Sequence, residues 1–182
     1  MTTCRDIVTR ALQMSGIVAL GRDPKAAETE AGMVSLQSLY DEWFTGGMFG
    51  RLKDVYADGI YTANEGERIT ADGATITLPT LYDDNKRPPY EFSAVVIVTG
   101  GTADNFVYHN GAWHNCAGLL LGDDAPLASI SVDGLAGCVA ERLVSTFGGD
   151  VSVGSARAAR QFKQALSLKI GATQPAATSV YF

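Results

Sequence analysis

Hydrophobic positions in the first 45 residues recur at the spacing of amphipathic helices. A first stripe predicts a short helix that Thr2 or Thr3 caps and Gly16 ends. Its apolar members are Ile7, Val8, Ala11 and Leu12. A second stripe predicts a longer helix from Pro24 to Thr45, with Asp23 as its cap. Its apolar members are Met33, Leu36, Leu39, Tyr40, Trp43 and Phe44, and we expect the final Trp-Phe pair to lie in the core.

From Gly50 the apolar pattern changes to a period of two, which is typical of strands. Three dipeptides of the kind that form tight hairpin turns lie between strand-like runs. They are Asp58-Gly59, Asp72-Gly73 and Asn110-Gly111. The continuous aliphatic run from Ala94 to Val98 predicts a fully buried strand. Residues 50–131 are therefore predicted to form an all-β module of about six to eight short strands.

Helical spacing returns at Asp133. The stripe of this third helix comprises Leu135, Val139, Leu143 and Phe147, and Gly148-Gly149 ends it. A fourth helix is predicted with Ser155 as its cap. Its apolar stripe is Ala159, Phe162, Leu166 and Ile170. The small residues and the aromatic end that follow predict an extended tail.

This order predicts an α+β fold in which a four-helix bundle-like domain contains an all-β module inserted between its second and third helices. Neither helical pair can bury its stripe alone, so we expect residues 1–49 and 132–170 to form one discontinuous domain. The inserted module is expected at 50–131 and an extended C-terminal arm at 171–182.

Charge and composition exclude several classes of protein. The 182 residues are 46% hydrophobic and 19% charged, which is typical of a globular chain. No apolar run is long enough to span a membrane, and the first residues lack the pattern of a secretory leader. Three cysteines far apart in sequence do not form a disulfide framework and are typical of a reducing compartment.

The net charge of −6 is distributed unevenly along the chain. It is −2 over residues 1–49, −6 over 50–131 and +2 over 132–182. Such a balance argues against a surface that binds nucleic acid throughout. Two explanations are compatible with this distribution. Acidic loops can keep the β module soluble, or acidic and basic faces of the protein can contact different partners.

Candidate chemistry in the sequence is sparse. His109, His114 and Cys116 lie close together, but a fourth ligand at matched spacing is missing, so no metal site is predicted. The acidic pairs Asp83-Asp84 and Asp123-Asp124 lack the ligand series of a calcium loop. No local motif indicates a nucleophile with its base, or a phosphate-binding loop. We therefore expect neither an enzyme nor a cofactor.

The opening of the chain resembles a known family. The stretch Ile7-Val8-Thr9-Arg10-Ala11-Leu12 is followed by Gly16-Ile17, by Gly21 and Pro24, and by a run from Ala31 that ends in Asp41-Glu42-Trp43. This pattern resembles the head-to-tail connector adaptors of tailed bacteriophages, also called head-completion or tail accessory proteins. The resemblance is specific over residues 7–47 and weaker over the last two helices, while the β module departs from the smallest family members.

The resemblance implies a structural virion protein at the head–tail interface, assembled in the cytoplasm of the host bacterium. Such adaptors form a ring, usually of twelve copies, beneath the portal protein. The ring extends the DNA channel and provides the platform for tail, stopper or nozzle proteins, while double-stranded DNA passes through without specific binding. A C-terminal arm that docks on the portal corresponds here to a stretch that includes Gln174, Pro175, Val180, Tyr181 and Phe182.

Charged residues have expected roles in such a ring. A DNA channel must not hold phosphate tightly, so acidic residues are expected to face the channel or the outer surface. The candidates are Asp54, Asp58, Glu65, Glu67 and Asp72. Arg157, Arg160 and Lys163 of the fourth helix are candidates for contacts with a neighbouring subunit or the portal, or else a solvated helix face.

Two other functions remain open on the sequence. In the first, the β module is a ligand-binding or decoration module that contacts carbohydrate or a fibre protein. Its candidate aromatic platforms are Tyr56, Tyr61, Tyr108 and Trp113. The second, a cell-wall hydrolase, requires a carboxylate pair that nothing in the sequence singles out.

Overall fold

The helices and strands follow one another as the sequence pattern predicts at the coarse level. The computed structural model describes residues 2–46, 48–49, 54–56, 59–62, 68–72, 75–78, 91–99 and 102–173. Within them the chain is α+β, with four helices and seven strands. The helices are α1 (Cys4–Met14), α2 (Ala26–Thr45), α3 (Val132–Phe147) and α4 (Val153–Thr173). The strands are β1 (Asp54–Tyr56), β2 (Gly59–Thr62), β3 (Arg68–Asp72), β4 (Thr75–Thr77), β5 (Ala94–Thr99), β6 (Thr102–His109) and β7 (Ala112–Asn115).

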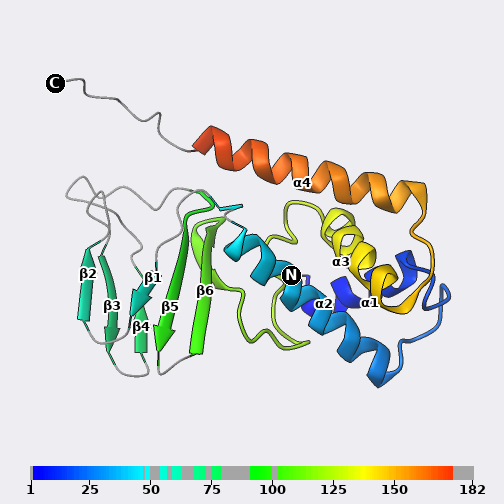
Figure 1. Cartoon of the computed structure of the whole chain (residues 1–182), viewed down its shortest axis with the longest axis horizontal. Coiled ribbons are helices and arrows are strands. Elements are labelled where there is room, and N and C mark those ends of the chain that lie inside the picture. Colours follow the sequence, from blue (N-terminus) through cyan, green and yellow to red (C-terminus); the bar gives the residue numbers. More distant parts are fainter. Residues whose placement is uncertain are drawn as a thin grey trace.

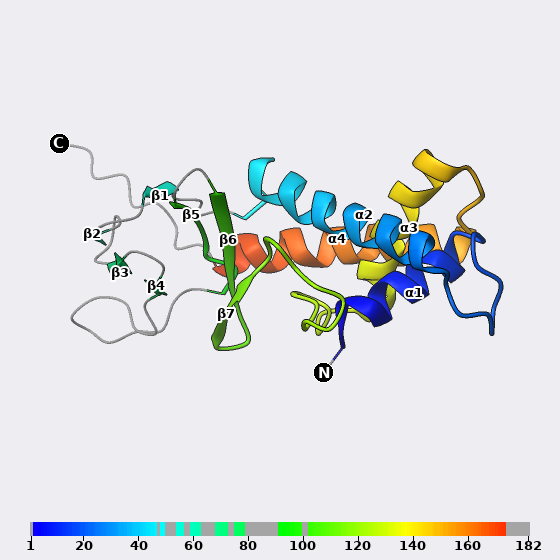
Figure 2. The same ribbon diagram turned by 90° about the horizontal axis from the view of Figure 1, so that it is seen from below.

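The helices gather at one end of the molecule and the strands at the other (Figure 1). Figure 1 shows α3 between α4 on one side and α1 and α2 on the other, and in Figure 2 the four helices again lie together at one end. Helices from the two ends of the chain therefore share one core. Trp43 of α2 stacks on Phe162 of α4, with ring centroids 5.9 Å apart. No helix in the described part of the chain is long and apolar enough to cross a membrane.

Close helix packing depends on several glycines, of which Gly32 and Gly134 make the closest approaches. Gly32 of α2 lies against Val8 of α1, and Gly134 of α3 lies against Phe162 of α4. A Cβ added at either glycine would approach its neighbour more closely than 3.0 Å, so each position admits only hydrogen. The predicted apolar stripes of α1 and α2 are buried as expected, including Trp43 and Phe44.

Several helix ends differ from the predictions. The α2 helix begins at Ala26 rather than Pro24, because the Glu28 carboxylate accepts the Lys25 backbone N–H at 2.7 Å and Lys25 is the cap. Ser155 does not cap α4: it is buried in the first turn, and the Ser152 hydroxyl accepts its N–H at 3.1 Å. The α4 helix also continues to Thr173, three residues into the predicted arm.

The α3 stripe ends earlier than predicted. Leu135, Val139 and Leu143 are completely buried, whereas Phe147 is 57% exposed at the last residue of the helix. The chain turns away at Gly148, whose φ is 73°, so no element covers the Phe147 ring. The start of α3 is capped by Ser131, whose hydroxyl accepts the Gly134 N–H at 3.0 Å.

The strands form two sheets. One has the order β1-β5-β6-β7 and the other the order β2-β3-β4. The Asn110-Gly111 and Asp72-Gly73 hairpins are confirmed, because β6 pairs with β7 and β3 with β4, both antiparallel. At the first of these turns both φ angles are positive, 52° and 78°, as such a turn requires.

The hairpin predicted at Asp58-Gly59 is wrong. The strands on its two sides belong to different sheets: β1 pairs in parallel with β5, and β2 pairs with β3. The prediction of a fully buried 94–98 strand also holds only in part. Ala94, Val95 and Ile97 are buried, but Val96 is half-buried.

Candidate functional site

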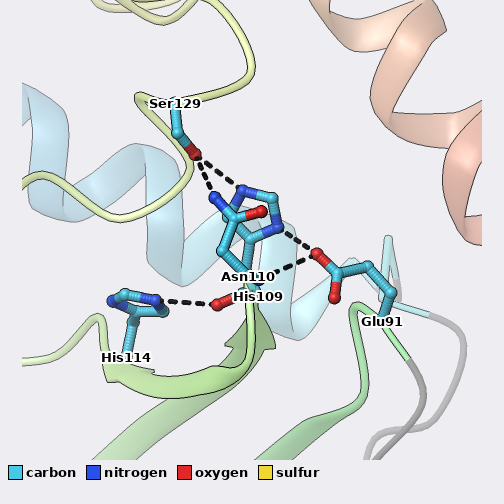
Figure 3. A network of polar contacts seen from close by, with 5 residues as sticks. All are labelled: Glu91, His109, Asn110, His114 and Ser129. Carbon is cyan, nitrogen blue, oxygen red and sulfur yellow. Dashed lines mark hydrogen bonds and ion pairs between the residues drawn. The ribbon is translucent and has the colours of Figure 1, made fainter.

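A polar network joins the four-stranded sheet to the loop that precedes α3 (Figure 3). Its members come from three separate segments of the chain. Glu91 precedes β5, His109 ends β6 with Asn110 in the turn after it, and Ser129 lies in the loop before α3. The histidine ring is the centre of the network and is only 5% exposed. One face of the ring stacks on Phe92, with centroids 5.2 Å apart and planes 20° apart.

Both ring nitrogens of His109 are engaged. Nδ1 contacts the Glu91 carboxylate, which can only accept when ionised, so Nδ1 carries the proton. In the neutral ring Nε2 then accepts the hydroxyl proton of Ser129, whose Oγ is 2.8 Å away. Asn110 donates twice, from Nδ2 to the Ser129 Oγ at 3.0 Å and from its backbone N–H to Glu91 at 3.0 Å.

Backbone geometry around the network is unusual. Phe92 and Leu127 both have φ near +64°, at 63° and 64°, a conformation that non-glycine residues seldom adopt. Each side chain is buried, so packing offsets a local cost of about 1–3 kcal/mol per residue. The segments that carry Glu91 and Ser129 are thus held in fixed positions beside His109.

The arrangement of Ser129, His109 and Glu91 is that of a nucleophile, a base and an acid that orients the base. Two observations favour a structural role instead. The Ser129 oxygen already accepts from Asn110, and the histidine ring is buried although Ser129 itself is exposed. The network therefore fits a connection between sheet and helices better than a reactive serine.

Sequence reasoning missed this network. It grouped His109 with His114 and Cys116, but the structure pairs His109 with Glu91 and Ser129, which are 18 and 20 positions away. His114 instead contacts the backbone oxygen of His109 through Nε2, at 3.0 Å. In the described part of the chain, no three His, Cys, Asp or Glu side chains gather where they could hold a metal. No local spacing signals the network, because its members come from three segments.

The three cysteines are all buried, and none is in a disulfide. Burial raises the pKa of the Cys4 thiol to about 11 and that of Cys138 to about 12. The pKa of Cys116 is raised further, again mainly by burial. These side chains act as small core residues, and the Cys138 thiol lies 3.7 Å from the backbone oxygen of Ala159 in α4.

The basic residues predicted to make contacts do lie on one helix, α4, but they differ in their surroundings. Arg157 and Arg160 are exposed. Lys163 is half-buried, and its Nζ is 2.8 Å from the Glu141 carboxylate of α3. Lys163 therefore joins α4 to α3, which leaves the two arginines as the cations of the outer face.

Other predicted residues fall largely outside the described part of the chain. The predicted portal-docking residues Gln174, Pro175, Val180, Tyr181 and Phe182 all lie outside it, as do the acids Asp58, Glu65 and Glu67. Asp54 begins β1 and Asp72 ends β3, and only their backbone is described. The role expected of these acids therefore stays a prediction.

The predicted aromatic platforms receive little support. Tyr108 is 6% exposed, and Trp113 packs edge-on against it at 5.3 Å between centroids. Trp113 also packs on Val95 and Ile97 of the sheet core. Tyr108 is therefore buried, whereas Trp113 is half-buried. Tyr56 and Tyr61 belong to β1 and β2, and their side chains lie outside the description.

Two surface grooves border α2. The first, which we call the α2–α3 groove, has a volume of about 460 Å³. Small residues of α2 line one wall, and Arg142, Ser145, Thr146 and Phe147 of α3 line the other. The second, of about 510 Å³, lies between the start of α2 and residues Leu119–Leu121.

Comparison with known proteins adds no relative. No protein-family model matches the chain, and no curated protein sequence matches it significantly. Function is therefore inferred from the residues of the chain and their geometry.

Proposed function

We propose that this chain is a structural, non-enzymatic adaptor at the head–tail joint of a tailed bacteriophage. The observation that carries the proposal is the pattern over residues 7–47, together with the way its parts pack. The stripe of α1 and the Asp41-Glu42-Trp43 end of α2 meet helices from the other end of the chain in one core. Such an arrangement suits a four-helix bundle-like adaptor domain with a β module inserted between α2 and α3.

Polar contacts between elements support a rigid subunit. Asp41 of α2 accepts from Asn105 of β6 at 3.2 Å, and Glu42 of α2 forms an ion pair with Arg142 of α3. The His109 network adds a third connection, between the sheet and the loop before α3. A joint that holds pressurised DNA needs subunits that keep their shape. The Asp41 and His109 contacts join the strand-bearing part to the helical part, and the Glu42–Arg142 pair joins two helices.

In this proposal copies of the chain form a ring, usually of twelve, beneath the portal protein. The ring extends the channel through which DNA passes without specific binding, and it offers a platform for tail, stopper or nozzle proteins. Acidic residues of the β module keep the phosphate backbone from adhering, because each basic contact would add affinity. The C-terminal residues after α4 dock on the portal, and no cofactor or membrane takes part.

The composition and symmetry of purified virions test this function. We expect mass spectrometry to find the protein in tailed particles, and an image reconstruction of the joint to place it between portal and tail. The helical part, α1 to α4, should fit the density as one body. Absence of the protein from virions, or its location anywhere but this joint, would contradict the proposal.

A further inference from the structure

We propose that the outer face of α4 in one copy docks into the α2–α3 groove of the next copy. This interface rests on the proposed function, because it specifies how the subunits of the ring contact each other. The partner is thus a second copy of this chain. The argument depends on the spacing, exposure and charge of two faces that lie on different elements.

The first face is a continuous stripe along α4. Its members recur at three- and four-residue spacing and therefore lie on one side of the helix. They are Val153, Arg157, Arg160, Gln164 and Leu168, which we call the α4 stripe. All five are exposed, with Val153 at 88% and Leu168 at 74%. The stripe is apolar at its two ends and positively charged in its middle. Within the described chain, neither arginine has an ion-pair partner.

The second face is a groove with small residues on its floor. Ala27, Ala31, Ser35 and Ser38 of α2 recur at helical spacing and leave room above the helix. Two exposed apolar side chains border this space: Val34, at 56%, and Phe147, at 57%. Helices pack when a ridge of long side chains enters a groove of short ones. The α4 stripe has the long side chains, and the α2–α3 groove has the short ones.

The charges of the two faces are complementary. Glu30 lines the groove, and Asp41 and Glu42 are exposed further along α2. Glu42 is paired with Arg142 and Asp41 accepts from Asn105, whereas Glu30 has no ion-pair partner in the described part of the chain. Arginine stems can cover the apolar floor while their guanidinium groups reach the carboxylates at its edge. Electrostatic complementarity of this kind fixes the register of two surfaces.

The position of the two faces determines the kind of assembly. The α4 stripe is on the side of α4 opposite the buried Ala159, Phe162 and Leu166, which pack inward. The groove is lined by α2 and α3, and Figure 1 shows α2 and α4 on different sides of the helical part. One copy can therefore use both faces at once, each with a different neighbour. Contacts between two unlike faces of identical subunits generate rings when the rotation closes.

Crosslinking of the full-length chain tests the interface directly. The double variant Ser38→Cys with Gln164→Cys places one thiol at the middle of each face, and the three native thiols are buried. With a short bismaleimide, we expect a ladder of dimers, trimers and larger species on a denaturing gel. A matched control pairs Gln164→Cys with Ala19→Cys, an exposed residue outside the groove, and should give no ladder.

Charge reversal supplies the second measurement. Arg157→Glu with Arg160→Glu, in the crosslinking background, should lower the ladder yield at least about tenfold, because like charges then face each other. Glu30→Lys should also lower the yield, and the three changes together should restore part of it. All three residues are exposed, and circular dichroism of each variant checks that the fold is unchanged.

The outcomes separate the interface from the proposed function. A ladder no stronger than the control, or one that charge reversal leaves unchanged, overturns the interface. So does a Gln164→Cys crosslink that forms only to portal protein in particles. If the protein lies at the joint but no ladder forms, the adaptor function stands without this interface. A ladder from a protein absent from virions supports the interface and overturns the adaptor function.

Discussion

At the scale of single residues, His109 joins the four-stranded sheet to the loop before α3. Its Nδ1 and Nε2 contact side chains from two other segments, and its ring stacks on Phe92. Because the ring is buried, its removal leaves a cavity and breaks the contacts of both ring nitrogens. A single substitution therefore disturbs Glu91, Asn110 and Ser129 together.

Replacement of His109 tests this role. We expect His109→Ala to lower the free energy of unfolding by about 2–4 kcal/mol, from a cavity and from polar groups left unpaired. Urea denaturation measures the change. Asp150→Ala, at an exposed residue, serves as the control and should change stability by less than about 0.5 kcal/mol. A loss for His109→Ala no larger than that of the control would contradict the role.

The same geometry predicts that Ser129 is not a nucleophile. Its hydroxyl oxygen accepts from Asn110, and the ring of its partner His109 is buried. We expect a fluorophosphonate probe to leave the folded protein unlabelled. Labelling that Ser129→Ala abolishes would instead assign a reactive serine and would contradict a purely structural network.

Buried thiols give a prediction about pH. Because folding raises the pKa of Cys4 to about 11 and of Cys138 to about 12, the folded state holds thiol protons that the unfolded state releases above about pH 8.5. Stability should therefore be highest below that pH and fall as the pH rises towards 11. Native protein at pH 8 should react slowly with Ellman's reagent, and all three thiols should react in denaturant. Rapid modification of the native protein would contradict this.

At the scale of elements, close approach of helices depends on Gly32. Its Cα lies against Val8, and an added Cβ would overlap the Val8 side chain. We expect Gly32→Ala to destabilise the protein by about 1–3 kcal/mol although alanine favours helix. The thermal unfolding midpoint measures the effect, and Val8→Ala in the same chain should recover part of it.

Gly154 provides a matched helical control for Gly32. It lies in the first turn of α4, where the nearest atom to an added Cβ is the Ser152 Oγ, at 3.8 Å. Gly154→Ala should therefore leave stability unchanged or raise it by up to about 1 kcal/mol. If both glycine variants behave alike, helix propensity and not close packing explains them.

The elements that the sequence predicts well are those whose signal is local. Stripes at helical spacing predict α1 and α2 within two residues at their starts, and Asn110-Gly111 predicts a real hairpin. The same kind of dipeptide at Asp58-Gly59 misleads, because the pairing partner of β1 is β5, some 40 positions along the chain. Local turn chemistry cannot report such a distant partner.

The two faces of the proposed interface are harder to predict than the fold, because one of them depends on contacts between segments far apart in sequence. Arg157 and Arg160 are identified as outward-facing because helical spacing shows it. The α2–α3 groove cannot be predicted from the sequence, because it depends on which helices become neighbours and on where α3 ends. Phe147 belongs to the apolar stripe by spacing, yet the turn at Gly148 leaves it exposed at the edge of the groove.

At the scale of the whole molecule, the C-terminal residues are expected to act on a partner and not on the fold. We predict that deletion of residues 174–182 weakens docking to the portal while the unfolding midpoint stays within the error of the full chain. The α4 helix ends before this segment, and its buried residues Ala159, Phe162 and Leu166 remain. Assembly of the truncated protein into particles at the normal level would contradict the prediction.

The shared core of α1–α2 and α3–α4 also has a consequence for synthesis on the ribosome. Residues 46–131 must be translated after α2 and before α3 begins, which takes roughly 4–17 s at about 5–20 residues per second. Until α4 leaves the exit tunnel, Trp43 lacks the Phe162 ring that covers it. The nascent chain thus presents an aromatic surface to chaperones for several seconds, and hosts deficient in trigger factor should yield more aggregated protein.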